Sequence, residues 1–258
     1  MTKSGRVQAI DRAIMILDCF TEKKPQLRLY EITEMLDINK STLHGIISTL
    51  KYHGFIDQDE LTQEYRLGLK HIEYGQRVLN SMDISIIAKP IIERVCNELE
   101  ETVHIGTLDD EEVVYIEKEE SKQSMRIFTT IGARNPAHTT GVGKAMLAYL
   151  DENELSNILP EDLVGLTHKS ITDKNQLKLE LEQIRLRGFA YDNEENNLGL
   201  TCVAAPIFDQ TGKAVYGISV SGPTMRMNSD KLTKASRIVK EAAEEISRKL
   251  GYRGKVSP

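Results

Sequence analysis

A chain of 258 residues is long enough for two domains, and 40% hydrophobic with 28% charged residues is typical of a folded globular protein. This composition excludes extended disorder, and no apolar run approaches the roughly 18 residues that a membrane span needs. The net charge of −6 argues against a uniformly basic, nucleic-acid-binding surface.

The charge is unevenly distributed along the chain. Residues 1–80 contain 11 of the 33 lysines and arginines and 11 of the 39 aspartates and glutamates, so the whole excess of negative charge lies in residues 81–258. A neutral N-terminal part can still present a basic face to DNA. The distribution therefore permits a DNA-binding domain at the N-terminus without requiring one.

The N-terminal sequence and the spacing of the cysteines indicate a cytoplasmic protein. Met1–Arg6 is polar and lacks the apolar stretch of a signal peptide. Cys19, Cys96 and Cys202 are too far apart to predict a disulfide framework or a metal site. A cytoplasmic protein without metal ion or cofactor is therefore expected.

The N-terminal part has the periodicity of short helices. Val7–Phe20 predicts an amphipathic helix that ends at Lys23–Pro25, and Leu29–Leu36 predicts a second, shorter one. Asp37–Asn39 forms a tight turn, in which Asn39 is suited to cap the helix that follows. The expected apolar residues of the first helix are Val7, Ile10, Ile14, Leu17 and Phe20, with Ala13 and Ile16 beside them.

The stretch Lys40–Leu50 is the candidate recognition helix. Leu43, Ile46, Ile47 and Leu50 follow the i, i+3, i+4, i+7 pattern of one buried face. Two short helices joined by a tight turn are typical of a helix-turn-helix. The residues expected to contact phosphates and base edges are Lys40, Ser41, Thr42, His44, Ser48 and Lys51.

Two strands and a long helix are expected next. Gly54 ends the recognition helix, and Phe55–Ile56 with Tyr65–Leu67 then predict a two-stranded wing. Arg66 in this wing is a further candidate contact to the DNA backbone. Gly68–Ser81 predicts a linker helix, and Ile84–Glu101 predicts another helix that contains Pro90.

From Thr102 onward the pattern alternates between strands and helices, which indicates an α+β domain with a mostly antiparallel sheet. Asp151 and Glu154 have the spacing of a capping box. The expected strands are Val103–Thr107, Val113–Ile116, Met125–Thr130, Phe189–Tyr191, Cys202–Phe208 and Ala214–Ser221. The expected helices are Gly143–Leu150, Thr172–Arg187 and the C-terminal stretch 232–250.

The glycine-rich segment Gly141–Ala145 superficially suggests phosphate binding. His138 and Ala145 occupy positions where a nucleoside-triphosphate-binding loop needs a glycine and a Ser or Thr, so nucleotide hydrolysis is not expected. A turn that opens a helix still offers free N–H groups to an anion. A tight turn without any ligand remains the alternative.

A hydrolytic site built from His104, His138, Asp192 and Ser219 finds no support, because no G-x-S-x-G nucleophile elbow is present. The chain is therefore not expected to be an enzyme. His104 is interpreted as a strand residue whose ring has partners. Cys202 begins a strand after the acidic loop Asp192–Glu195 and is interpreted as a candidate pocket-lining residue. A solvated surface turn is the alternative for the loop.

Seven short segments, in one order from residue 7 to about 250, resemble the isocitrate lyase regulator (IclR) family of bacterial transcription factors. Each segment is weak alone, and together they make the resemblance specific. They are Ala9–Ala13, Lys40–His44, Tyr65–Gly68, Gly143–Ala148, Ile184–Phe189, Ala204–Asp209 and Ile218–Pro223.

The resemblance implies an architecture and a site. A winged helix-turn-helix would span residues 1–67, a linker helix 68–82, and a GAF-like effector-binding domain with an antiparallel sheet and flanking helices 83–258. The effector would bind where the glycine turn, the strand after Gly188 and the last hairpin converge. By motif, the effector-binding residues would be Gly141, Val142, Asp192, Cys202, Ser219 and Ser221.

One residue departs from the family pattern. The family usually has an arginine after the histidine of the recognition helix, and this chain has Gly45. Arginine is the common bidentate reader of guanine, so phosphate positioning is the safer expectation for this helix. Glycine also weakens a helix by about 1 kcal/mol relative to alanine.

The resulting prediction is a DNA-binding transcriptional regulator, expected to be a repressor. Its expected partners are a double-stranded DNA operator and a small organic or sugar acid, with no membrane, and its expected assembly is a homodimer or homotetramer. Two alternatives stay open: a regulator that acts through a protein partner without a small-molecule effector, and a hydrolase or transferase with an accessory helical domain.

Overall fold

The computed structural model describes residues 7–21, 23–80, 83–125, 127 and 129–254. The chain is divided into two compact units, residues 1–81 and 82–258. The polar start Met1–Arg6 and the end of the expected linker helix, Ser81, lie outside the described residues. The division of the chain at residues 67 and 82 stays a prediction.

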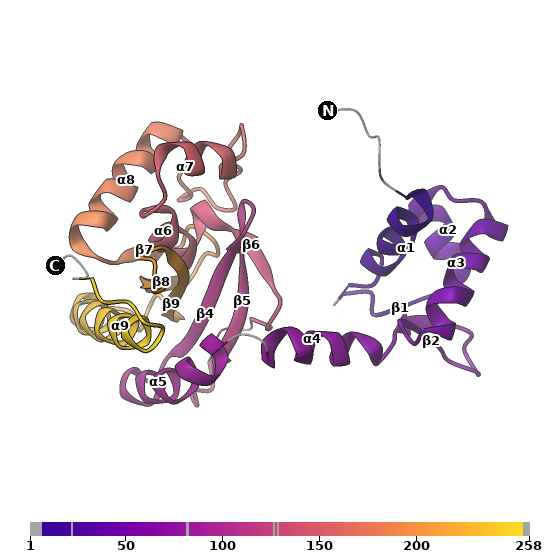
Figure 1. Cartoon of the computed structure of the whole chain (residues 1–258), viewed down its shortest axis with the longest axis horizontal. Coiled ribbons are helices and arrows are strands. Elements are labelled where there is room, and N and C mark those ends of the chain that lie inside the picture. The colour runs from indigo at the N-terminus through magenta and orange to yellow at the C-terminus, as the bar shows by residue number, and fades with distance from the viewer. Residues whose placement is uncertain (1–6, 22, 81–82, 126, 128, 255–258) are drawn as a thin grey trace. The chain divides into compact units, whose positions relative to one another are not determined.

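The first unit contains a helix-turn-helix followed by a wing (Figure 1). Its strands form a small antiparallel sheet in the order β1-β3-β2, in which β1 is a short strand that the sequence pattern did not predict. The elements are α1 (Gln8–Asp18), β1 (Gln26–Leu27), α2 (Leu29–Leu36), α3 (Lys40–Tyr52), β2 (Ile56–Gln58), β3 (Tyr65–Leu67) and α4 (Lys70–Asn80).

Helix α1 has two apolar faces rather than one. Ile16 and Phe20 pack in the core of the unit with 0% and 8% of their surface exposed. Val7, Ile10 and Ile14 are 59%, 58% and 51% exposed. The expected amphipathic helix is present, but its apolar residues divide between a buried side, which includes Ile16, and an exposed side.

Helix α3 is built as its sequence pattern predicts. Leu43 and Ile47 are buried against Ile16, Ile32 and Ile56 in one cluster. Asn39 caps the helix, accepting a hydrogen bond of 2.8 Å from the amide of Thr42. The chain leaves the helix at Gly54, whose φ of +76° suits a residue without a side chain.

The second unit is an α+β domain around one six-stranded antiparallel sheet, with the strand order β6-β5-β4-β9-β8-β7. Its first helix, α5, continues through Pro90. The elements are α5 (Asp83–Leu99), β4 (Thr102–Asp109), β5 (Glu112–Glu119), β6 (Arg134–Pro136), the 3-10 turn η1 (Ala137–Thr139), α6 (Gly141–Leu147), α7 (Glu152–Ile158), α8 (Lys174–Arg187), β7 (Ala190–Asn193), β8 (Leu200–Phe208), β9 (Ala214–Pro223) and α9 (Ser229–Lys249).

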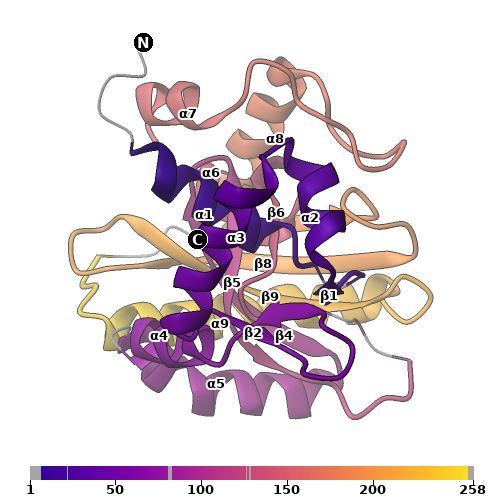
Figure 2. The same ribbon diagram turned by 90° about the vertical axis from the view of Figure 1, so that its right-hand side faces the viewer.

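Helices cover both faces of this sheet. Helices α5 and α9 pack on one face, and α6 packs on the other (Figure 1). Figure 2 shows α7 and α8 on the same side of the sheet as α6, with α5 and α9 on the opposite side. A core of buried side chains fills the space between the sheet and α6 to α8, among them Met146, Leu147, Leu177, Leu181 and Ile184.

The expected third strand at Met125–Thr130 was wrong for the residues that the structure describes there; Arg126 and Phe128 lie outside them. The edge strand is β6 instead, which pairs with β5 through Arg134 and Val114. Alternating polarity misled the prediction, since Met125 is 59% exposed and belongs to no sheet face. The chain turns at Gly132 before it reaches the sheet edge.

Candidate functional site

The polar face of α3 is open to solvent. Lys40, His44 and Ser48 are exposed, and no side-chain hydrogen bond or ion pair is recorded for them within the described residues. Ser41 is also exposed, but its hydroxyl donates a 3.0 Å hydrogen bond to the capping Asn39. Thr42 is half-buried at the helix start. Lys40, His44 and Ser48 are therefore the α3 side chains most available to a ligand such as DNA.

The wing cation is already paired. Arg66 donates two hydrogen bonds to Asp57, at 3.0 Å from Nε and 2.6 Å from Nη2. These bonds hold the pKa of the Asp57 carboxyl below its usual value. Lys51 at the end of α3 donates a 2.9 Å hydrogen bond to Gln58 of β2. Arg66 and Lys51 would have to exchange these partners to bind phosphate.

Gly45 lies on this open face. A Cβ placed on it would meet no atom within 4 Å, so packing does not demand glycine there. We expect Gly45→Ala to raise the free energy of unfolding of the first unit by about 1 kcal/mol, because alanine restricts the unfolded chain and favours helix. Urea unfolding followed by circular dichroism measures this change, and a lower stability would contradict the open environment.

Strand pairing brings the expected effector residues onto one sheet face. Asp192 of β7 lies opposite Cys202 of β8, which lies opposite Ser221 of β9. Ser219 lies two residues before Ser221 on the same strand, opposite Ala204. Directly opposed residues in antiparallel strands share a face, as do residues two apart. Asp192, Cys202, Ser219 and Ser221 therefore share one face.

The start of α6 lies over this same face. A Cβ on Gly141 would be 3.3 Å from the Cβ of Ala204 and 3.7 Å from that of Cys202, so the backbone of α6 rests directly on β8. Val142 is buried against the face as well. The structure thus brings together all six residues expected to bind an effector.

Helix α6 needs glycine for a second close approach. A Cβ on Gly143 would lie 2.1 Å from the carbonyl oxygen of Ala137, so no side chain fits there. Thr140 caps the helix by accepting a 3.0 Å hydrogen bond from the Gly143 amide. The first bond of the helical pattern runs from the Lys144 amide to Thr140, so the amides of Gly141 and Val142 precede it.

Asp192 is buried and held in place by backbone amides. Its carboxylate accepts hydrogen bonds from the amides of Glu195, at 2.8 Å, and Asn196, at 3.3 Å. Burial raises the pKa of Asp192 to about 6, and these amides and Lys144 oppose the rise. Burial also raises the pKa of the neighbouring Cys202 thiol well above its usual value, so this cysteine is a neutral lining group.

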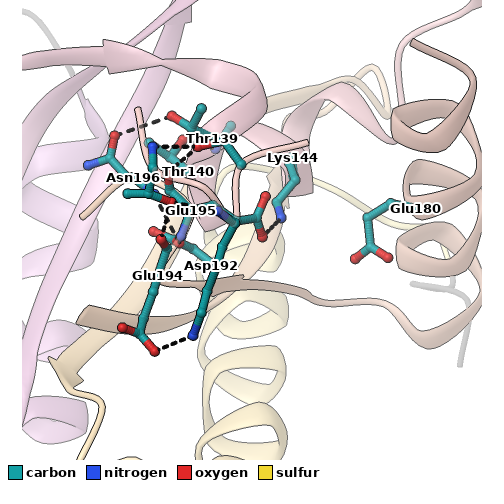
Figure 3. A network of polar contacts seen from close by, with 12 residues as sticks. Thr139, Thr140, Lys144, Glu180, Asp192, Glu194, Glu195 and Asn196 are labelled. Carbon is teal, nitrogen blue, oxygen red and sulfur yellow. Dashed lines mark hydrogen bonds and ion pairs between the residues drawn. The ribbon is translucent and has the colours of Figure 1, made fainter. Parts of the chain in front are cut away.

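A buried ion pair supports the loop that carries these amides (Figure 3). Lys144 of α6 is paired with Glu195, and their side chains are 1% and 9% exposed. Thr139 donates a 3.2 Å hydrogen bond to Asn196 in the same network. Figure 3 shows Lys144 reaching toward Glu195 while Glu180, on α8, stands apart. The pair holds the loop whose amides bind Asp192.

The sequence interpretation missed this pair. In the sequence, Lys144 belongs to the glycine-rich segment Gly141–Ala145, which points to an anion and not to a carboxylate side chain. The available signal was a single cation in the otherwise apolar run Gly141–Ala148, because a cation on a buried helix needs a buried partner. Nothing local identified Glu195 as that partner, since the two residues are 51 positions apart.

Two observations bear on other kinds of site. Within the described residues, no three His, Cys, Asp or Glu side chains gather as a metal site would require. None of the described helices is long and apolar enough to cross a membrane.

Two sequence profiles match the chain. The profile described as "IclR helix-turn-helix domain" matches residues 9–60. The profile described as "Bacterial transcriptional regulator IclR C-terminal" matches residues 76–248, which is more than half of the chain. The first match lies within the first unit, and the second begins at residue 76, inside the first unit, and covers most of the second.

Known proteins are similar over almost the whole length. The HTH-type transcriptional regulator XynR of Escherichia coli (strain K12) is 36% identical, over 95% of this chain and 98% of its own. The Transcriptional repressor IclR of the same organism is 33% identical, over 97% of this chain and 92% of its own. The crystal structure of the Thermotoga maritima IclR has a TM-score of 0.78 and 37% identity, covering 96% of this chain and all of the other.

Proposed function

The chain belongs to the IclR family of bacterial transcriptional regulators, and on that basis we propose that it represses transcription in the cytoplasm by binding an operator through α3, until a small acid releases it. The observation that carries the acid-binding part is the shared sheet face of Asp192, Cys202, Ser219 and Ser221 beneath the start of α6. Serine hydroxyls and backbone amides can donate to a carboxylate, and Asp192 can accept from a ligand hydroxyl.

The proposed DNA contacts are Lys40, Ser41, Thr42, His44 and Ser48 on α3, with Lys51 and Arg66 reaching the backbone from the wing side. Lys40, His44 and Ser48 support this assignment most strongly, because they are exposed and have no side-chain partner in the part of the chain that the structure describes. The assignment as DNA contacts is weaker for Lys51 and Arg66, because each side chain already donates a hydrogen bond within the protein. Phosphate oxygens can replace such partners when DNA approaches.

The acid-binding part is tested by thermal denaturation with pyruvate, D-gluconate and 4-hydroxybenzoate. We expect at least one of these acids to raise the melting temperature of the full chain, since a ligand that binds only the folded state stabilises it. Ser219→Ala should abolish that shift, and Ser236→Ala, a change of the same type on the distant helix α9, should leave it intact. A shift that survives Ser219→Ala would contradict the proposed site.

We also propose that the chain assembles as dimers, alone or within tetramers, through the exposed face of α1. Val7, Ile10 and Ile14 are each more than half exposed at helical spacing, and such a stripe favours a partner helix. We take the partner helix to be α1 of a second copy of this chain, because two recognition helices are needed to read two half-sites.

Ile10→Asp is expected to convert the dimer into a monomer, because it places a charge in an apolar contact. Sedimentation velocity measures the assembly state, and Lys23→Asp, in the exposed loop before β1, is the control. A dimer that persists in Ile10→Asp at the same protein concentration would place the interface elsewhere.

The alternative within the same family is a regulator that is controlled by a protein partner alone. This alternative predicts that no acid changes the melting temperature while repression continues. The absence of a nucleophile elbow and the regulatory names of the relatives leave no observation that favours a hydrolase or transferase.

A further inference from the structure

His104 is a buried histidine whose ring nitrogens have no partner. It lies on β4 with 2% of its surface exposed. Neither Nδ1 nor Nε2 has a hydrogen-bond partner within the described part of the chain. The sequence interpretation of a ring with satisfied hydrogen bonds was therefore wrong. Buried polar groups without a partner are rare in folded proteins and are costly, so each calls for a reason.

Strand pairing places this ring on the candidate effector face. His104 lies directly opposite Ser219 of β9, and Thr102, two residues earlier, lies opposite Ser221. Its ring also contacts Tyr115, at 5.2 Å between centroids, and Tyr115 belongs to the core cluster that includes Val142 of α6. The ring therefore lies on the same side of the sheet as Ser219 and α6.

The start of α6 lies over the strand β8, next to the two serines of β9. Gly141 rests on Cys202 and Ala204, and Val142 lies against Gly106 and Gly217. Ser221 and Ser219 lie opposite Cys202 and Ala204, at the level of Gly141 along the strands, and His104 lies opposite Ser219. A ligand seated on this face would meet the two serines and the unpartnered ring together.

Burial favours the neutral form of the His104 ring. Burial lowers the pKa of His104 to about 3, and Lys118, which lies opposite it on β5, lowers it further. Glu120 opposes this effect, and Lys118 itself is paired with Glu120 at 2.7 Å. Two other titratable groups lie on the same face. Burial raises the pKa of Asp192 to about 6 and raises the pKa of the Cys202 thiol well above its usual value, so the thiol is protonated. A neutral imidazole has one N–H donor and one acceptor nitrogen.

We propose that His104 binds the carboxylate of the effector together with Ser219, the ring N–H donating to one carboxylate oxygen and the serine hydroxyl donating to the other. Opposed residues of antiparallel strands have Cβ atoms about 5 Å apart, which lets two short donors meet the two oxygens of one carboxylate. This inference rests on the proposed function, since it requires an acid on this face. It assigns the carboxylate to the β4–β9 side and leaves Asp192 for a ligand hydroxyl.

Isothermal titration of the full chain with pyruvate, D-gluconate and 4-hydroxybenzoate tests the assignment. The acid that binds the wild-type chain should bind His104→Phe about 10- to 100-fold more weakly, as expected for one lost hydrogen bond to a charged group. His104→Asn or His104→Gln, which restores an N–H near one ring nitrogen, should recover part of the affinity. His168→Phe, an exposed histidine of the same unit, should bind as the wild type does.

The outcomes separate the inference from the proposed function. If Ser219→Ala loses the acid and His104→Phe binds it as tightly as the wild type, the acid site stands and the role of His104 is overturned. If no acid binds the wild-type chain, the proposed acid response fails and the carboxylate assignment fails with it. Should His104→Phe not fold, the ring signal of His104 in the wild-type chain decides by nuclear magnetic resonance. A shift on adding the acid supports contact, and an unchanged signal contradicts it.

Discussion

Changing both Lys40 and His44 to alanine is expected to weaken operator binding by about 30-fold or more. Each good side-chain contact to a base edge or phosphate contributes about 1–3 kcal/mol, and the two changes remove two contacts per recognition helix. Both side chains are exposed and have no recorded partner within the described residues, so their loss should leave the fold unchanged. Gel retardation on a fragment selected from random DNA with the wild-type chain measures the effect.

Two controls make this result interpretable. Lys23→Ala removes an exposed cation from the loop before β1 and should change operator affinity little. The double variant should melt like the wild type and bind the same acid. Sequence-specific retardation at wild-type affinity by the double variant would show that α3 does not read the operator. A smaller dependence of binding on salt is also expected, because fewer phosphates are neutralised.

Lys144→Met is expected to lower the free energy of unfolding of the second unit by about 3–5 kcal/mol, because it leaves a buried carboxylate without its cation. Glu195 is the partner, and one of its oxygens already has no hydrogen bond in the described part of the chain. Burial raises the pKa of Glu195, and Lys144 opposes that rise. Without Lys144 the carboxyl should bind a proton more readily.

The same loop supplies a matched control. Lys169 pairs with Glu194 at 2.6 Å, but the lysine side chain is 38% exposed, so Lys169→Met should cost less than about 1 kcal/mol. Urea unfolding of both variants compares the two pairs directly. The double change of Lys144→Met and Glu195→Gln should recover part of the loss, since no lone charge remains buried. Equal small losses for the two lysine variants would contradict a buried ion pair at Lys144.

Helix α3 was predictable because its signals are local. The spacing of Leu43 and Ile47 fixes the buried face, and Asn39 caps the start within three residues. The second apolar face of α1 was not predictable, because Val7, Ile10 and Ile14 look like core residues to a periodicity argument. Burial is decided by what packs against a helix, and the sequence pattern does not state that.

The candidate effector face was predictable only in part. Ser219 and Ser221 share a face by alternation alone, and the family resemblance added Asp192 and Cys202. The opposition of His104 and Ser219 depends on the register between β4 and β9, which no local pattern sets. The same holds for Lys144 and Glu195, which long-range folding brings together.

The measurement that tests the central claim most directly is operator affinity with and without a bound acid. Fluorescence anisotropy of the full chain on its selected operator would be recorded before and after adding the acid that raises its melting temperature. We expect the acid to weaken operator binding of the wild type by about 5- to 150-fold and to leave Ser219→Ala unchanged. An acid that binds the wild type without altering operator affinity, or that releases Ser219→Ala from DNA equally well, would contradict the account.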